Sequence, residues 1–159
     1  MEKNLEVLES MIYYWSTLTE RGKVGEEFLA SIYEEQGMKD TYNDDFDDES
    51  VSKVLSAIAN REAFKGRTEN ESRFWNNNMW MLEDMEYMNK VIYPLKKLNL
   101  EGLGDGEVIF LPLHLDLFYK KGNTLYINFF MIKPDEINGT DKLTIEDVEV
   151  KEWIKKNMG

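Results

Sequence analysis

The stretch VIFLPLHLDLFYKKGNTLYINFFMIK, residues 108–133, decides the fold class. Apolar residues recur here at every second position, which is the pattern of half-buried β-strands. Lys-Lys-Gly-Asn at 120–123 is well suited to a hairpin loop between two such strands. Pro112 places its strand at an edge of the sheet or breaks it there. The stretch therefore predicts a small antiparallel hairpin.

The two faces of this hairpin have different residues. One face carries Leu113, Leu115, Leu117, Leu125, Ile127, Phe129 and Met131, which we expect to pack on the helices. The other carries His114, Asp116, Phe118, Tyr126, Asn128 and Phe130. Because three exposed aromatic side chains on one face are unusual, we expect Trp153 and Ile154 of a final helix to cover them, although a partner protein is an alternative.

The chain before the hairpin has the period of helices. Apolar residues at steps of three and four predict helices over residues 2–18, 26–36, 51–64 and 69–93. We expect Gly37 to stop the second helix, Ser50 or a preceding Asp to cap the third, and Pro94 to end or kink the fourth. Thr144 and Asp147 resemble a capping box for a short final helix that ends near residue 157. The sequence thus predicts an α+β protein with a single domain, residues 1–159: a helical part over 1–98, and a β-hairpin with a short C-terminal helix over 104–159.

Composition limits the kind of protein. The 159 residues include no cysteine, which excludes disulfides and thiolate metal sites. No stretch approaches the ~20 apolar residues of a membrane span. The start MEKNLEVLES carries carboxylates where a signal peptide needs basic residues. We therefore expect a soluble, cytoplasmic protein.

The net charge of −12 is concentrated in the first third of the chain. Residues 1–50 hold 14 acidic and 4 basic side chains, whereas residues 51–100 carry a net +2. A surface of this sign repels nucleic-acid phosphates and anionic membranes and attracts basic surfaces. Simple solubility is the alternative explanation.

The most acidic segment is DTYNDDFDDES, residues 40–50. It has no helical or strand period, and self-repulsion predicts an exposed, mobile loop. The aromatic residues Tyr42 and Phe46 flank or interrupt the acids and are candidate anchors for a partner. We expect the segment to dock into a groove lined by Lys and Arg, with help from carboxylates on the second predicted helix. The partner-binding candidates are Tyr42, Asp44, Asp45, Phe46, Asp47, Asp48, Glu49, Glu27 and Glu34; a solvated linker without a partner is the alternative.

Signals for catalysis or cofactors are weak. His114 is the only histidine, and with Asp116 it forms the one pair that a small enzyme could use. A metal site needs more ligands than this pair, and the acidic segment lacks the glycine and the final glutamate of an EF-hand loop. Nucleophile and phosphate-binding motifs are absent. The sequence predicts no cofactor and no metal.

Direct nucleic-acid binding has one local signal. Arg61, Lys65, Arg67 and Arg73 form a basic cluster, and helices followed by a hairpin have the order of a winged helix. Against the total charge this cluster is small, and pairing with acids of the first third of the chain is the alternative explanation. We expect no direct contact with nucleic acid.

The acidic stretch 40–49, the row Glu26, Glu27, Glu34 and Glu35, and the lack of cysteine together resemble a known class of inhibitor. In length and in its helices-then-hairpin layout, the chain is similar to the anti-CRISPR proteins of phages and mobile elements that inhibit type II RNA-guided DNA nucleases. The resemblance implies a protein without catalysis that blocks a basic nucleic-acid or catalytic surface of the nuclease. An immunity protein that neutralises a toxin nuclease would use the same physics. A small enzyme that uses His114 and Asp116 is the alternative from another class, and an adaptor in a larger complex is a third.

Overall fold

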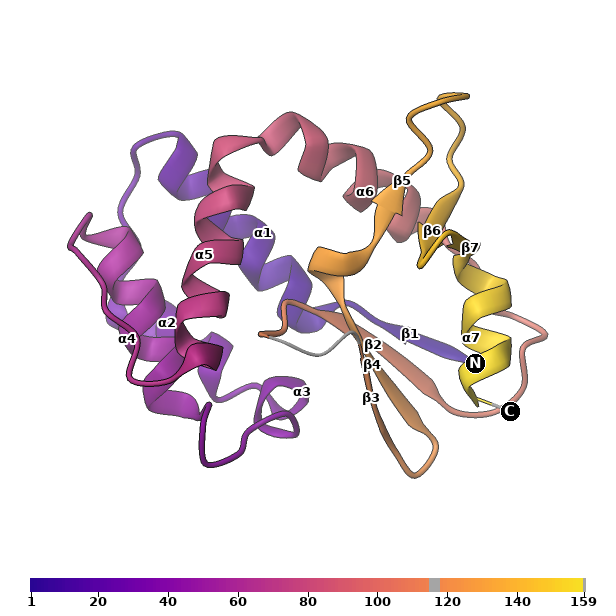
Figure 1. The fold of residues 1–159 in the computed structure, drawn as a ribbon, viewed down its shortest axis with the longest axis horizontal. Coiled ribbons are helices and arrows are strands. Elements are labelled where there is room, and N and C mark those ends of the chain that lie inside the picture. Colours follow the sequence, from indigo (N-terminus) through magenta and orange to yellow (C-terminus); the bar gives the residue numbers. More distant parts are fainter. Residues whose placement is uncertain (115–117, 159) are drawn as a thin grey trace.

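The computed structural model describes residues 1–114 and 118–158. Its helices are α1 (Glu6–Thr19), α2 (Glu26–Tyr33), α3 (Gln36–Lys39), α4 (Asp48–Ala59), α5 (Glu69–Glu83), α6 (Met85–Lys97) and α7 (Val150–Met158). Its strands are β1 (Glu2–Asn4), β2 (Glu107–Leu111), β3 (Phe118–Lys121), β4 (Thr124–Asn128), β5 (Lys133–Pro134), β6 (Leu143–Ile145) and β7 (Val148–Glu149). Helices α1, α2, α4 and α5 gather at one side of the molecule, and the sheets and α7 lie at the other (Figure 1). The predicted α+β class with a helical N-terminal part and a C-terminal helix is confirmed.

The main sheet is mixed rather than a simple hairpin. Its strand order is β1-β2-β4-β3, and β1, β2 and β4 are parallel. The predicted hairpin exists only between β3 and β4, which pair antiparallel around Gly122 and Asn123. The expected long first strand ends at Leu111, directly before Pro112, and its first part becomes the parallel neighbour β2. Proline has no N–H to donate to a ladder, so the break at Pro112 follows the prediction while the pairing of β2 does not.

A second, three-stranded sheet replaces the predicted capping box. Thr144 lies within β6, and the residues that follow it, Glu146 and Asp147, have φ of 51° and 65°. Two residues with positive φ between antiparallel strands form the hairpin turn that matches the natural twist of the strands. Glu149 then accepts hydrogen bonds from the backbone N–H of Lys151 and Glu152 at the start of α7. The final helix is therefore present, but it starts after Glu149.

The predicted helix boundaries need corrections. Residues 2–4 are strand rather than helix, because they pair with β2 and because Lys3 donates to three carbonyls at the end of α6. Gly37 does not stop α2; it lies inside α3, buried with Ile109 against it. The helix expected over 69–93 is interrupted at Asp84, whose side chain caps α6, and Pro94 sits within α6 near its end. The third helix ends at Ala59 rather than near residue 64.

One hydrophobic core includes residues of both the helices and the main sheet. Trp15 is fully buried at its centre, where its ring stacks on Phe129 with ring centroids 5.8 Å apart. The indole N–H of Trp15 donates to the side chain of Asn78, which is also buried, at 2.9 Å. Because a buried polar group is stabilised only when it is hydrogen-bonded, this pair fixes α1 against α5.

The covering of the hairpin by the final helix is confirmed for one aromatic residue. The ring of Phe118 meets the ring of Trp153 edge-on at 5.0 Å, and Trp153 and Ile154 are both buried. Leu115, Asp116 and Leu117 lie outside the described residues. His114 and Asn128, which we placed on a half-exposed face, are instead 2% and 0% exposed.

Candidate functional site

The acidic segment is ordered and compact. Asn43 and Phe46 form a β-bridge through two backbone hydrogen bonds of 2.9 and 3.3 Å. The side chain of Asn43 also accepts from the backbone N–H of Asp45 at 2.8 Å, as in an Asx-turn. These bonds hold Asp44 and Asp45 at the tip of a tight turn, which is exposed as predicted but has regular hydrogen bonds where the sequence predicts an irregular loop.

The two aromatic residues of the segment face inward. Phe46 is 1% exposed, and its ring stacks on His114 at 4.2 Å and meets Phe74 edge-on at 5.1 Å. Tyr42 is half-buried, and its hydroxyl donates to the carbonyl of Tyr33 at 2.6 Å. Burial first, and then the charges of Asp48 and Asp47, raise the pKa of Tyr42 far above its usual range. In this structure Phe46 cannot contact a partner, which corrects its predicted role; it anchors the segment in the core instead.

A buried carboxylate of α5, that of Glu71, holds the acidic segment in place through hydrogen bonds. Glu71 is 3% exposed; one of its oxygens accepts from the Ser50 hydroxyl at 2.7 Å and the other from the Arg67 backbone N–H at 2.9 Å. The Arg67 guanidinium lies 3.4 Å from the same carboxylate. Next to it, the Thr68 hydroxyl donates to the carbonyl of Asp45 at 2.6 Å. Side chains at and near the start of α5 therefore hold the acidic segment in place. The sequence gave no reason to select them, since Glu71 resembles any exposed acid on a helix surface.

Both ends of the segment are also fixed. At its start, the Asp40 carboxylate accepts from the Tyr126 hydroxyl of β4 at 2.6 Å, and the Asp40 carbonyl accepts from the Lys121 ammonium. At its end, Asp47 caps α4: its carboxylate accepts from the Ser50 backbone N–H at 3.0 Å, and the Ser50 hydroxyl accepts from the Asp47 backbone N–H. This reciprocal capping box confirms that an Asp before Ser50 caps the helix. Asp47 therefore has a structural role, and it is only partly exposed.

Four acidic side chains of the segment remain exposed. They are Asp44, Asp45, Asp48 and Glu49. Among them, Glu49 forms an ion pair with Lys53 at 3.0 Å, and both of these side chains are largely in solvent. Asp48 and Glu49 lie in the first turn of α4, where the helix dipole favours negative charge.

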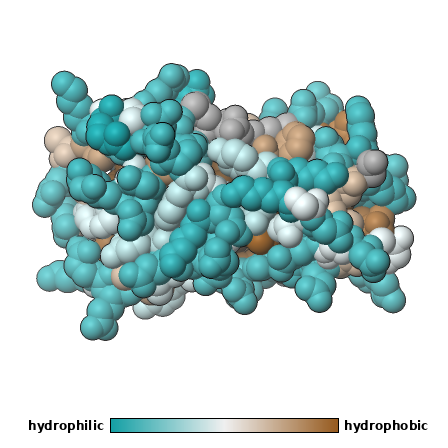
Figure 2. Space-filling view, turned by 90° about the horizontal axis from the view of Figure 1, so that it is seen from below, coloured by the Kyte–Doolittle hydropathy of each residue, from teal (hydrophilic) through white to brown (hydrophobic). Residues whose placement is uncertain are grey.

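The structure places the two carboxylates predicted on the second helix, Glu27 and Glu34, at opposite ends of α2. Glu34 directly follows Tyr33, the residue whose carbonyl binds Tyr42, so Glu34 lies at the same end as the acidic segment. Glu27 is about 10 Å further along α2, at the end where Ser56 of α4 meets Glu26. We define the acidic surface as Glu34, Asp44, Asp45, Asp48 and Glu49. The side of the molecule that includes the turn between α3 and α4 is mostly hydrophilic (Figure 2).

The carboxylates of this surface are exposed and lie on backbone that is fixed by the core. His114 is buried beneath Phe46, and the Tyr119 hydroxyl lies 3.2 Å from its Nε2. Asp116, its predicted catalytic partner, is outside the described residues. In the part of the chain that the structure describes, no group of three or more His, Cys, Asp or Glu side chains could hold a metal ion.

The four side chains of the predicted basic cluster differ in their surroundings. Arg67 and Arg73 take part in ion pairs with Glu71 and Glu69, and the Arg67 guanidinium also donates to the carbonyl of Asp44 at 3.4 Å. Arg61 and Lys65 are exposed and, over residues 1–114 and 118–158, the structure records no ion pair for either. Both ion pairs are with acids of α5 rather than with acids of the first third of the chain, which Arg67 contacts through the backbone carbonyl of Asp44.

No helix within the described ranges is long and apolar enough to cross a membrane. Comparison with known proteins adds no relative: no family model, no curated protein and no solved structure matches the chain.

Proposed function

We propose that this protein is a non-enzymatic inhibitor that uses its acidic surface to bind a basic nuclease in the cytoplasm, in the first instance a type II CRISPR effector. It would block DNA cleavage by occupying a positively charged nucleic-acid surface. The guide–target channel of such an effector is lined by basic side chains that bind a phosphate backbone. Carboxylates that are held on a turn and at the start of a helix can compete with that phosphate backbone for those side chains.

The observation that carries the proposal is the rigid mounting of exposed carboxylates. Asp44 and Asp45 project from a turn whose next residue, Phe46, is 1% exposed. The turn is also bound by Thr68, and the neighbouring helix start by buried Glu71. A solvated linker needs no such anchoring. Preorganised groups lose less conformational entropy when they bind, so each charge contributes more to affinity than it would on a mobile loop.

The direct test is DNA cleavage by a panel of guide-loaded type II effectors with and without this protein in modest excess. We expect inhibition of at least one effector, and the order in which guide, target DNA and protein are added then locates the blocked step. Lack of inhibition across the panel discards the CRISPR assignment. Capture with a toxin nuclease is then the next measurement.

A pair of matched variants tests the surface itself. The first replaces the four exposed acids of the segment, as Asp44→Asn, Asp45→Asn, Asp48→Asn and Glu49→Gln. The control removes the same charge elsewhere on the exposed surface, as Glu83→Gln, Glu86→Gln, Glu101→Gln and Asp105→Asn. At about 0.5 kcal/mol for each rim charge, the first variant loses about 2 kcal/mol of binding, or about 30-fold in affinity. Equal losses in both variants would mean that only net charge matters.

A further inference from the structure

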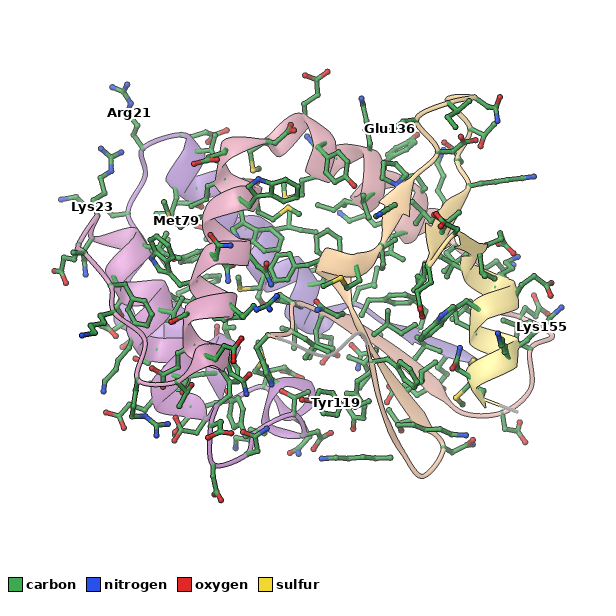
Figure 3. The ribbon with its side chains drawn as sticks, viewed as in Figure 1. Arg21, Lys23, Met79, Tyr119, Glu136 and Lys155 are labelled. Atoms are coloured by element: carbon green, nitrogen blue, oxygen red, sulfur yellow. The ribbon has the colours of Figure 1, made fainter. Side chains whose placement is uncertain are left out.

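The connection between β5 and β6 contains the only Asn-Gly pair of the chain, Asn138 and Gly139. This connection extends away from the body of the molecule (Figure 1), and Glu136, two residues before the pair, lies at the same outer edge (Figure 3). Asn138 and Gly139 are both exposed, and Ile137 before them is 94% exposed. Solvent therefore has access to both residues of the pair.

An asparagine side chain can react with the backbone that follows it, which is one reason why asparagine is a thermolabile residue. The amide nitrogen of the next residue loses its proton and attacks the side-chain carbonyl carbon, Cγ. The new C–N bond closes a five-membered succinimide ring, and the side-chain nitrogen leaves as ammonia. Water then opens the ring at either carbonyl and gives Asp or isoAsp. Glycine as the next residue favours ring closure, because it has no Cβ to crowd the attacking nitrogen.

The surroundings of Asn138 suit this reaction better than those of the other asparagines. Eight of the 13 asparagines lie in helices or strands, where the regular backbone holds the next amide nitrogen in the ladder or helix. Among the rest, the side chains of Asn43 and Asn99 accept backbone hydrogen bonds at 2.8 Å. Asn60 and Asn123 are followed by an arginine and a threonine, whose side chains hinder ring closure. Within the described residues, the structure records no hydrogen bond for the side-chain amide of Asn138.

Asp135 folds the connection into a turn around the pair. Its carboxylate accepts from the backbone N–H of Asn138 at 3.1 Å and from the Thr140 hydroxyl. Its carbonyl accepts from the backbone N–H of Gly139 at 3.2 Å. The Thr140 hydroxyl, and then the backbone N–H of Asn138, hold the pKa of Asp135 below its usual range, so the carboxylate is ionised at neutral pH. The nitrogen that must attack Asn138 is thus bound within the turn.

We propose that Asn138 is a site of spontaneous deamidation, and that the turn formed by Asp135 sets the rate by holding the backbone N–H of Gly139. The hydrogen bonds of the turn are exposed, and exposed bonds of this kind open locally at small cost. The turn therefore slows the reaction rather than prevents it.

The reaction changes the charge and the shape of this end of the molecule. It replaces a neutral amide with a carboxylate, which adds one negative charge to the net charge of −12. Asp135, Glu136 and Asp141 already line a hollow of about 590 Å³ between this connection and α6, and the new carboxylate repels them. In the isoAsp product, Cβ of residue 138 also becomes part of the backbone, so the turn can no longer close with the same geometry.

The test is incubation of the intact protein at pH 7 and at pH 9, with peptide mapping by mass spectrometry and measurement of released ammonia. We expect Asp and isoAsp at residue 138 before any other asparagine converts, and faster conversion at pH 9, because the attacking nitrogen must lose its proton. The matched control is Asn138→Gln, whose longer side chain closes a ring less readily, and it should release little ammonia. Earlier conversion of another asparagine, or equal ammonia release from the control, would overturn the proposal.

A free peptide with the sequence of residues 136–142 gives the rate without the turn. We expect residue 138 of the folded protein to convert about tenfold more slowly than the peptide. A rate more than about a hundredfold below that of the peptide would mean that the folded protein protects Asn138, and would refute the proposed site. A rate equal to that of the peptide would refute the role of the turn.

Two variants of exposed or half-exposed residues separate the turn from simple charge. Asp135→Ala removes the carboxylate that binds Asn138 and Thr140, and we expect conversion about threefold to tenfold faster than in the parent. Asp141→Ala removes the same charge from the same hollow, and its carboxylate pairs with Lys97 rather than with the turn. We expect the parent rate for Asp141→Ala. An unchanged rate in Asp135→Ala, or equal acceleration in both variants, would contradict control by the turn.

Discussion

Replacing Phe46 with alanine distinguishes a core anchor from a surface anchor. The ring is 1% exposed and contacts His114, Phe74 and Tyr42, which belong to three different segments of the chain. Because these neighbours are held by separate elements, the site cannot collapse around the missing ring. Phe→Ala in a core costs 3–5 kcal/mol, and we expect about 4 kcal/mol here. At 2–4 °C per kcal/mol for a chain of this length, the melting temperature falls by about 12 °C.

Urea denaturation followed by tryptophan fluorescence measures this change. Phe64→Ala is a suitable control, because Phe64 is half-buried and, among the described residues, its ring stacks on Trp75 alone. We expect the control to lose about 1 kcal/mol. A loss in Phe46→Ala no larger than that of the control would refute the assignment of Phe46 to the core.

The conservative variant Phe46→Leu completes the argument. It keeps most of the apolar volume, and we expect it to lose about 1.5 kcal/mol of stability and to bind the partner as the parent does. A surface anchor would behave in the opposite way, with unchanged stability and weakened binding. That opposite pattern would restore the role that the sequence predicts for Phe46.

Three further changes test other parts of the structure. Asp47→Ala removes the capping box of α4, so the free energy of unfolding of the protein should fall by about 1–2 kcal/mol in urea titration. A change below about 0.3 kcal/mol would contradict the role of Asp47 as the cap. Lys3→Met removes three hydrogen bonds to carbonyls at the end of α6 and should lower stability by about 2 kcal/mol, with faster amide exchange in the last turn of α6; unchanged exchange there would speak against this contact. Burial, and then the nearby carboxyl of Glu6, raise the pKa of Glu35, so the folded state holds the proton of this carboxyl more tightly than the unfolded state. The stability that the bound proton contributes is lost as pH rises through the raised pKa. Glu35→Gln should therefore raise the melting temperature at pH 7 but not below the ordinary pKa of 4.5, and an equal effect at both pH values would argue against the shift.

Local patterns predicted the elements whose signals are local. The three- and four-residue spacing of apolar residues located most of α1, α2 and α4, and the Asp before Ser50 gave the cap. The turn at Gly122 and Asn123 was predicted for the same reason. Each of these features depends on residues within a few positions of one another.

Long-range contacts determined the rest. β1 has three residues and is a strand only because it pairs with β2, more than 100 residues later in the sequence. The pattern of residues 40–50 gave no sign that Phe46 would enter the core, because its ring contacts come from α5 and from the segment after β2. Glu71 is indistinguishable in sequence from exposed helix acids until the segment folds over it. The exposed acids of the candidate surface could be predicted, whereas the contacts of Phe46 and Glu71 that hold them in place could not.

The most direct test of the acidic surface is the equilibrium affinity for an inhibited, guide-loaded effector, measured at low and at physiological salt. We compare the parent, the four-acid variant at residues 44, 45, 48 and 49, and the control with four neutralised acids elsewhere. We expect the parent and the control to bind with a steep dependence on salt, and the four-acid variant to bind about 30-fold more weakly with a flatter dependence. Equal affinity and equal salt dependence for all three proteins would contradict the claim that this surface contacts the partner.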